Sequence, residues 1–223
     1  MAIMDYDFVT FDCYGTLIDW ETGISEAIAA AAREDGVLLG RDQIVRAYHE
    51  VEPAVEAAEY RPYKEVLRDT AIGVAQRLGW DLAGEQARFL ADGLSRWPAF
   101  ADTNAALEQM KAIGYKLGIL SNVDDDLLRQ TLSHFEVEFD LLVTAEQVRS
   151  YKPAHGHFQR ARDLIGNERW LHTAQSYFHD IVPACELGIP VVWVNRKAEA
   201  PLGDACADSE VATLRELADR LCE

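Results

Sequence analysis

Long apolar runs are missing from this chain of 223 residues, and so is a recognisable export leader. No apolar run approaches the roughly 20 residues that a helix needs to cross a bilayer. The first residues, Met1–Asp7, show no basic segment followed by an apolar one, which is the pattern of a signal peptide. We therefore expect a cytoplasmic protein without a membrane partner.

Positive charge is also scarce. The chain carries 21 Lys and Arg against 38 Asp and Glu, which gives a net charge of −17. An acidic protein repels the phosphates of nucleic acids, so we expect no nucleic-acid partner. A small anionic substrate would need a local group of positive side chains or N–H donors, because the field of the whole chain repels it.

Cysteine and histidine are few and show no metal-binding pattern. The four cysteines lack the paired spacing of a zinc site, and no two of the six histidines lie four residues apart. Without an export signal we expect reduced thiols, since disulfides are rare in the cytosol. The cysteines are Cys13, Cys185, Cys206 and Cys222.

The arrangement of apolar residues predicts an α/β protein. After Pro98, short apolar runs alternate with helical segments, which is typical of a doubly wound parallel sheet. A last helix is predicted from about Ser209 to Leu221. The predicted strands are Phe8–Phe11, Tyr115–Leu120, Phe139–Val143, Ala174–Phe178 and Val191–Val194.

Residues 21–97 show a different pattern, which is helical throughout. Apolar positions recur every three or four residues around Ile24 and Ile28, and glycines and prolines divide the segment into several helices. We predict an α/β core domain of residues 1–20 and 97–223, into which a helical domain of residues 21–96 is inserted.

The stretch around Asp12 is the most informative part of the chain. Asp12 follows the apolar run Phe8–Phe11 and precedes a glycine turn, Cys13-Tyr14-Gly15-Thr16-Leu17. Ligands of open α/β sheets bind outside the carboxyl ends of the strands, and a carboxylate there can act as a covalent nucleophile. An aspartate in this position also fits a plain helix N-cap, so the stretch alone leaves both interpretations open.

Three further motifs follow the later strands in a fixed order. Ser121–Asn122 ends one apolar run, Lys152–Pro153 follows another, and Asp180 follows the segment Thr173–His179. With Asp12, this order resembles that of the haloacid dehalogenase superfamily over nearly the whole chain. The resemblance implies a Rossmann-like α/β core and identifies the inserted helical domain with the cap that covers the active site.

Tyr14 distinguishes between branches of that superfamily. Its phosphatases carry a second aspartate two residues after the nucleophile, and Tyr14 occupies that position here. Tyrosine, with a pKa near ~10, is a poor acid at neutral pH, but a departing halide needs no proton. The resemblance is therefore to the type II 2-haloacid dehalogenases and implies hydrolysis of small 2-halo carboxylic acids through an aspartyl ester, without cofactor or metal. A magnesium-dependent phosphatase and a non-catalytic binding protein of the same fold remain alternatives.

The resemblance implies a role for each catalytic motif residue. Asp12 would be the nucleophile, and Lys152 would keep it charged, because a nearby cation lowers a carboxylate pKa. Asp180 would orient Lys152 and activate the hydrolytic water. Thr16 and Ser121 would orient the oxygens of Asp12.

The substrate contacts are also implied by the resemblance. The backbone amides of Cys13 and Tyr14, with Ser121 and Asn122, would hold the substrate carboxylate in a nest of donors. Asn122 would also help to cradle the departing halide.

The cap should supply an arginine for the halide. Arg46, on an amphipathic stretch, is our candidate, and Arg41 and Arg61 are close rivals. The family further favours a homodimer.

The chain departs from the known dehalogenase pattern around Asp180. The pattern has serine and asparagine five and three residues before this aspartate, whereas here Gln175 and Tyr177 stand there. His179 replaces an aromatic residue, and Phe158 replaces a tyrosine. We therefore expect the residues that position water to differ, with His179 acting either as a base or ligand contact or only as a space filler.

Overall fold

The computed structural model describes residues 6–56, 59–204 and 206–222. These residues form two compact units. The α/β unit contains the described residues up to Ile18, Ala99–Asn122 and the residues from His134 onward. The helical unit contains Asp19–Pro98 and also Val123–Ser133, a segment that lies outside the predicted insertion.

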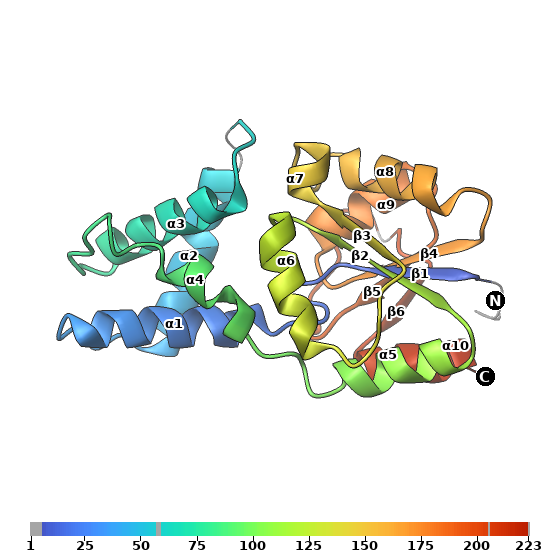
Figure 1. Ribbon diagram of the computed structural model, residues 1–223, viewed down its shortest axis with the longest axis horizontal. Coiled ribbons are helices and arrows are strands. Elements are labelled where there is room, and N and C mark those ends of the chain that lie inside the picture. The colour runs from blue at the N-terminus through green and yellow to red at the C-terminus, as the bar shows by residue number, and fades with distance from the viewer. Residues whose placement is uncertain (1–5, 57–58, 205, 223) are drawn as a thin grey trace. The chain divides into compact units, whose positions relative to one another are not determined.

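The α/β unit is built on a parallel sheet in the order β3-β2-β1-β4-β5-β6. Helices α5 and α10 cover one face, and α7, α8 and α9 cover the other (Figure 1). The prediction of an α/β fold with a doubly wound parallel sheet is confirmed. The strands are β1 (Phe8–Phe11), β2 (Lys116–Ser121), β3 (Leu141–Thr144), β4 (Trp170–Ala174), β5 (Val191–Val194) and β6 (Ser209–Val211).

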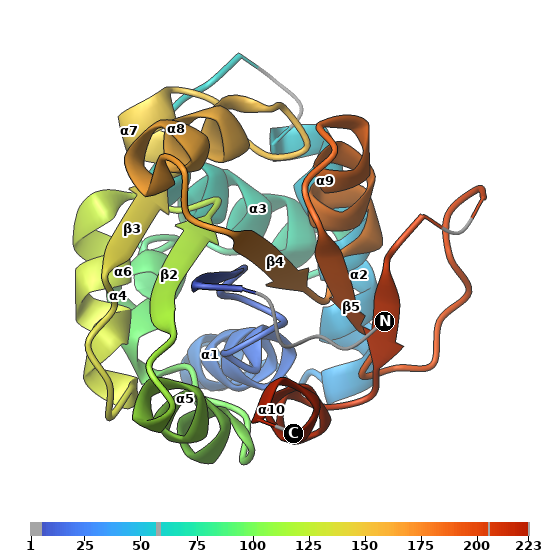
Figure 2. The same cartoon turned by 90° about the vertical axis from the view of Figure 1, so that its right-hand side faces the viewer.

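The helices of this unit follow the strands. They are α5 (Thr103–Ala112), α7 (Ala145–Val148), α8 (Gly156–Ile165), the π-helical turn η3 (Tyr177–Ile181), α9 (Val182–Glu186) and α10 (Leu214–Cys222). Figure 2 shows the strands side by side between the two helical layers.

The order of the strands explains where a site can form. The chain leaves β1 toward β2 and β3 on one side and returns to β4 on the other side. Ligands of such sheets bind at the carboxyl ends of the strands where the order reverses, here beside β1 and β4. Both strands are buried along their whole length, as expected for a parallel sheet that is covered on both faces.

Two local predictions in this unit are wrong. The strand that we expected at Ala174–Phe178 lies earlier, because Trp170–Ala174 pairs with β1 and β5, and Ser176 then begins η3 by accepting a hydrogen bond from the His179 N–H. The last helix begins at Leu214 instead of about Ser209, since residues 209–211 pair with β5 as an edge strand.

The helical unit contains no strand among its described residues. Asp124, before α6, accepts the N–H groups of Tyr63 and Lys64 at 2.8 and 3.0 Å and so caps α3. This explains why residues 123–133 belong to the unit. Its helices are α1 (Trp20–Glu34), α2 (Arg41–Glu56), α3 (Tyr63–Arg77), α4 (Phe89–Gly93), η1 (Leu94–Arg96) and α6 (Asp125–Thr131), and η2 (Leu132–His134) follows α6.

The cysteines differ from expectation. Cys185 on α9 and Cys206 form a disulfide with a Cα–Cα distance of 6.2 Å, whereas Cys13 and Cys222 are free. The prediction of four reduced thiols is therefore wrong for this pair, which the fold brings together across 21 residues of sequence. Because cytosolic proteins seldom keep structural disulfides, the cytoplasmic location stays a prediction.

No helix in the described part of the chain has both the length and the apolar character that spanning a membrane requires.

Candidate active site

Three charged side chains meet at the carboxyl edge of the sheet. The Lys152 ammonium donates to Asp12 Oδ1 at 2.8 Å, to Asp180 Oδ1 at 2.6 Å and to the Leu120 carbonyl at 2.9 Å. These three acceptors match the three protons of the ammonium. Lys152, Asp12 and Asp180 are only 1%, 7% and 0% exposed. The sequence predicted that these three residues lie on strand ends, and the fold brings their side chains into contact.

The charges of this group are unequal, with two carboxylates around one ammonium. Burial raises the pKa of Asp12, and the negative charge of Asp180 adds to this effect, while Lys152 opposes it. Burial also acts to raise the pKa of Asp180, but the Lys152 ammonium and the His172 hydrogen bond outweigh it and bring that pKa to about 2. Burial acts to lower the pKa of Lys152, yet the two carboxylates raise it above its ordinary value.

Thr16 holds the second oxygen of Asp12. Its hydroxyl donates to Asp12 Oδ2 at 3.0 Å and accepts the Gln175 N–H at 2.9 Å. The turn that carries Thr16 needs Gly15, whose φ of 105° is one that other residues rarely adopt. Both oxygens of Asp12 are thus fixed, Oδ1 by Lys152 and Oδ2 by Thr16, which agrees with the orienting role predicted for Thr16.

Arg196, which lies just beyond β5, is a site residue for which no role was predicted. Its guanidinium donates to the Thr16 carbonyl at 2.9 Å and binds both carboxylate oxygens of Asp102 at 3.0 and 3.2 Å. It also stacks over the Phe100 ring, 4.0 Å from the centroid. Its position at the carboxyl end of a buried strand was the only signal in the sequence. Arg196 supports the turn that places Thr16 against Asp12.

Ser121 and Asn122 end β2 but differ in their contacts. The Ser121 hydroxyl is buried and has no hydrogen-bond partner among the described residues, so it does not hold Asp12 here. The Asn122 amide binds the main chain of Lys152 twice, accepting its N–H at 2.7 Å and donating to its carbonyl at 3.0 Å. Asn122 therefore positions Lys152, and its predicted contact with substrate stays a prediction.

Cys13 and Tyr14 form the start of the turn. The Cys13 carbonyl accepts the N–H groups of Leu17 and Ile18, and burial raises the pKa of its thiol well above the ordinary value. Tyr14 forms a β-bridge with Ile18 and is half-buried. The predicted binding of a substrate carboxylate by their amides remains a prediction.

The candidate arginines all belong to the helical unit. Arg46 is exposed on α2, and its Nε donates to the Asp42 carbonyl at 3.1 Å. Arg61 forms an ion pair with Asp69 at 2.5 Å, and Arg41 donates to a hydroxyl on α1. Which of them meets a leaving group stays a prediction.

Two histidines near the site, His157 and His172, are buried, and His179 is partly buried. His157 lies 3.0 Å from the Ser121 carbonyl, and burial with the nearby Lys152 charge lowers its pKa to about 3. His179 Nδ1 lies 3.0 Å from the Ser176 hydroxyl, and burial lowers its pKa. His172, which the sequence analysis left without a role, lies 3.1 Å from Asp180 Oδ1.

The residues that replace the expected serine and asparagine engage other groups. The side-chain amide of Gln175 donates to Glu199 at 3.3 Å. The Tyr177 hydroxyl accepts the Cys206 N–H at 3.1 Å, and its ring packs edge-on against Trp193. Phe158 packs edge-on against His172 at 5.1 Å between centroids.

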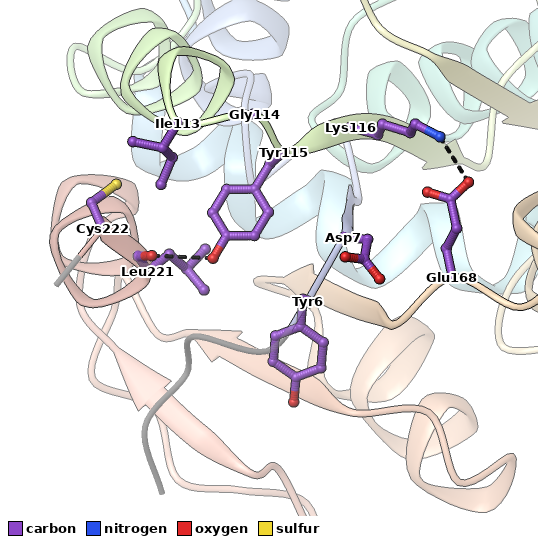
Figure 3. Close-up of a pocket in the computed structure, with 9 residues that line it drawn as sticks. All are labelled: Tyr6, Asp7, Ile113, Gly114, Tyr115, Lys116, Glu168, Leu221 and Cys222. Atoms are coloured by element: carbon purple, nitrogen blue, oxygen red, sulfur yellow. Dashed lines mark hydrogen bonds and ion pairs between the residues drawn. The ribbon is translucent and has the colours of Figure 1, made fainter.

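A hollow of about 620 Å³ lies at the opposite, amino-terminal edge of the sheet (Figure 3). Its charged groups are already paired, because Lys116 binds Glu168 at 2.7 Å and Asp7 binds Arg169 at 2.8 Å. The carboxyl edge remains the better candidate, since ligands of such sheets bind there. Within the described residues, no three His, Cys, Asp or Glu side chains are grouped so that they could hold a metal ion.

Comparisons with known proteins place the chain among relatives of the same fold. A relative from Pseudomonas sp. (strain YL), an (S)-2-haloacid dehalogenase, is 28% identical, and the alignment covers 97% of this chain and 95% of the relative. A solved L-2-haloacid dehalogenase has the same fold, with a TM-score of 0.85 at 22% identity over 97% of this chain and 99% of the other.

A second solved structure is an L-2-haloacid dehalogenase from Xanthobacter autotrophicus with chloropropionic acid covalently bound. It has a TM-score of 0.78 at 19% identity and covers 96% of this chain and 97% of the other. The family model for haloacid dehalogenase-like hydrolases matches residues 6–173, which is most of the chain. With its parallel sheet and its Asp12–Lys152–Asp180 group, the chain belongs to the haloacid dehalogenase-like hydrolases.

Proposed function

We propose that this hydrolase cleaves the carbon–halogen bond of small 2-halo carboxylic acids and releases a 2-hydroxy acid and halide. The observation that carries the proposal is the fixed Asp12 carboxylate, held by Lys152 and Thr16 at the edge where ligands bind. Tyr14 in place of a second aspartate supports a leaving group that needs no acid. The (S)-2-haloacid dehalogenases among the relatives support the same activity.

In the first step a carboxylate oxygen of Asp12 attacks the carbon that bears the halogen. The new carbon–oxygen bond makes an ester with the enzyme, and the halide leaves with the electron pair of the broken bond. Lys152 favours the charged form of Asp12 that attacks, against the effect of burial. The unpartnered Ser121 hydroxyl is available as a donor to the substrate carboxylate.

In the second step water attacks the carboxyl carbon of the Asp12 ester. Asp180 takes a proton from the water and passes it to the oxygen of the departing hydroxy acid. The rebuilt Asp12 carboxyl group then loses its remaining proton to solvent. Lys152, which contacts both Asp12 and Asp180, stabilises the negative charge that develops on the carbonyl oxygen of the Asp12 ester.

The proposed function is tested by measuring halide and phosphate release side by side, with and without magnesium. We expect chloride from 2-chloropropionate, no phosphate from phosphate monoesters, and no change in rate after dialysis against a chelator. Phosphate release that returns with magnesium would favour a phosphatase, because hard cations prefer carboxylate and water oxygens. Release of neither product would leave a binding protein of this fold.

The origin of the product oxygen tests the ester route. A single turnover in heavy-oxygen water should give unlabelled hydroxy acid, because its oxygen comes from Asp12, and repeated turnover should label the peptide that contains Asp12. Asp180→Asn should slow ester hydrolysis more than halide release, so that the ester is seen as added mass. Labelled product on the first turnover would make Asp12 a general base instead.

The acid limb of the rate profile should report the ionisation of Asp12. Its pKa is raised above the ordinary 3.8 by burial and by the Asp180 charge. Single-turnover halide release should therefore fall, as pH is lowered, with a midpoint above 3.8. In Asp180→Asn the midpoint should move to lower pH, because the negative charge of Asp180 no longer raises the pKa of Asp12. A midpoint that does not move would show that the acid limb does not report the ionisation of Asp12 beside Asp180.

We also propose a cytoplasmic homodimer with no nucleic-acid or membrane partner. The acidic composition supports the absence of a nucleic-acid partner.

A further inference from the structure

His172 lies at the centre of a buried chain of polar groups behind the site. It is fully buried in β4, directly beside Thr10 in the register of β1 and β4. Its Nδ1 lies 2.8 Å from the Thr10 hydroxyl, and its Nε2 lies 3.1 Å from Asp180 Oδ1. The Trp170 indole N–H donates to the same Thr10 hydroxyl at 2.7 Å. Three side chains, those of Trp170, Thr10 and His172, thus connect the middle of the sheet to Asp180.

The chemistry of these groups fixes the direction of the hydrogen bonds. An indole N–H can only donate, so the Thr10 oxygen accepts from Trp170. Its second lone pair leaves open whether Thr10 donates to His172 Nδ1 or accepts from it, so the Asp180 end of the chain decides. The ionised Asp180 carboxylate can only accept, so the proton of the neutral imidazole is on Nε2 and is donated to Asp180, and Nδ1 accepts the Thr10 hydroxyl proton.

This donation makes the two oxygens of Asp180 different. Oδ1 accepts from both Lys152 and His172. Oδ2 is also buried, yet no other described group forms a hydrogen bond with it. A buried carboxylate oxygen without a partner is unfavourable unless a ligand or water supplies the hydrogen bond. Oδ2 is therefore the oxygen with free lone pairs for an incoming donor.

We infer that His172 is a positioning residue for the hydrolytic half of the reaction. By binding Oδ1, together with Lys152, it holds Asp180 in the orientation in which Oδ2 accepts the proton of the attacking water. This inference rests on the proposed ester route. His172 itself neither gains nor loses a proton, because the proton moves from water to Asp180 and then to the departing hydroxy acid.

The kinetic test separates halide release from ester hydrolysis in a single turnover with 2-chloropropionate. Halide is measured after rapid quenching, and the ester is measured as added protein mass. His172→Leu removes the hydrogen bond to Asp180, which acts in ester hydrolysis. Halide release, the earlier step, should therefore stay within about threefold of wild type. Ester hydrolysis should slow roughly 10- to 100-fold, the range found when a group that orients a metal ligand is lost. His172→Gln places an amide N–H near the position of Nε2 and should recover most of the lost rate.

The matched control is Thr173→Val, the next residue of β4. Its hydroxyl is buried and has no hydrogen-bond partner within the described chain, so the change disturbs the strand without removing a contact to Asp180. We expect both steps at wild-type rates. Ester accumulation in Thr173→Val as large as in His172→Leu would overturn the inference, and so would equal slowing in His172→Leu and His172→Gln.

A measurement on the resting protein tests the hydrogen-bond direction apart from activity. Nitrogen-15 NMR of the histidine rings should show the proton of His172 on Nε2, and a proton on Nδ1 would overturn the inference. Normal ester hydrolysis in a folded His172→Leu protein would overturn the role of His172 alone. A wild-type protein that releases no halide would instead overturn the proposed function, and this role with it.

Discussion

Replacing Asp12 with asparagine should abolish halide release while leaving the protein folded. An amide cannot attack as a carboxylate does, and loss of a nucleophile costs several orders of magnitude in rate, roughly 10⁴-fold or more. The amide oxygen can still accept the Lys152 hydrogen bond. Because the change leaves one carboxylate facing one ammonium, we expect the free energy of unfolding to be no lower than in wild type. Halide release and thermal unfolding followed by circular dichroism measure the two effects.

A matched control is Asp19→Asn in the helical unit. Asp19 begins α1 by accepting the Thr22 N–H at 3.1 Å, and asparagine is an equally good N-cap. The same chemical change should leave both rate and stability nearly unaltered there. A folded Asp12→Asn protein with near wild-type activity, once mass spectrometry has excluded deamidation, would remove Asp12 from the mechanism.

The sequence was sufficient to bring the principal site residues together. Asp12 directly follows an apolar run, Lys152 follows one after a short loop, and Asp180 follows the segment Thr173–His179. A parallel sheet places the carboxyl ends of its strands at one edge. Contacts of 2.6 and 2.8 Å with Lys152 agree with that reasoning. The roles of these residues in catalysis are proposals that the variants above test.

Other parts of the site depend on register and turn geometry, which a single sequence does not contain. His172 lies outside the strand expected at Ala174–Phe178, and its pairing with Thr10 and the π-helical turn Tyr177–Ile181 place it beside Asp180. The strand expected at Ala174–Phe178 was misplaced for the same reason, since the Ser176 cap that ends the extended segment acts through its side chain. The disulfide between Cys185 and Cys206 likewise follows from tertiary contacts and not from spacing.

Lys152→Met should remove activity and also lower stability strongly. The change leaves two carboxylates, both nearly inaccessible to solvent, without their shared counter-ion. Removing one partner of a buried ion pair typically costs about 3–5 kcal/mol. We expect a loss of that size in the free energy of unfolding at pH 7, measured with urea. Halide release should fall as well, since burial then raises the pKa of Asp12 without the opposing charge of Lys152.

The loss of stability in Lys152→Met should also depend on pH. Lys152 lowers the pKa of both Asp12 and Asp180, so its removal raises both values in the folded protein. When the pKa of a carboxyl group is higher in the folded than in the unfolded protein, the folded protein loses stability as the pH rises through the folded-state pKa. The difference in free energy of unfolding between wild type and Lys152→Met should therefore become smaller as the pH is lowered. Lys116→Met, which breaks the exposed pair with Glu168, is the control and should change the free energy of unfolding little, because solvent screens exposed ion pairs. Equal stability of the two variants at pH 7 would mean that Asp12 and Asp180 are not both charged in the folded protein.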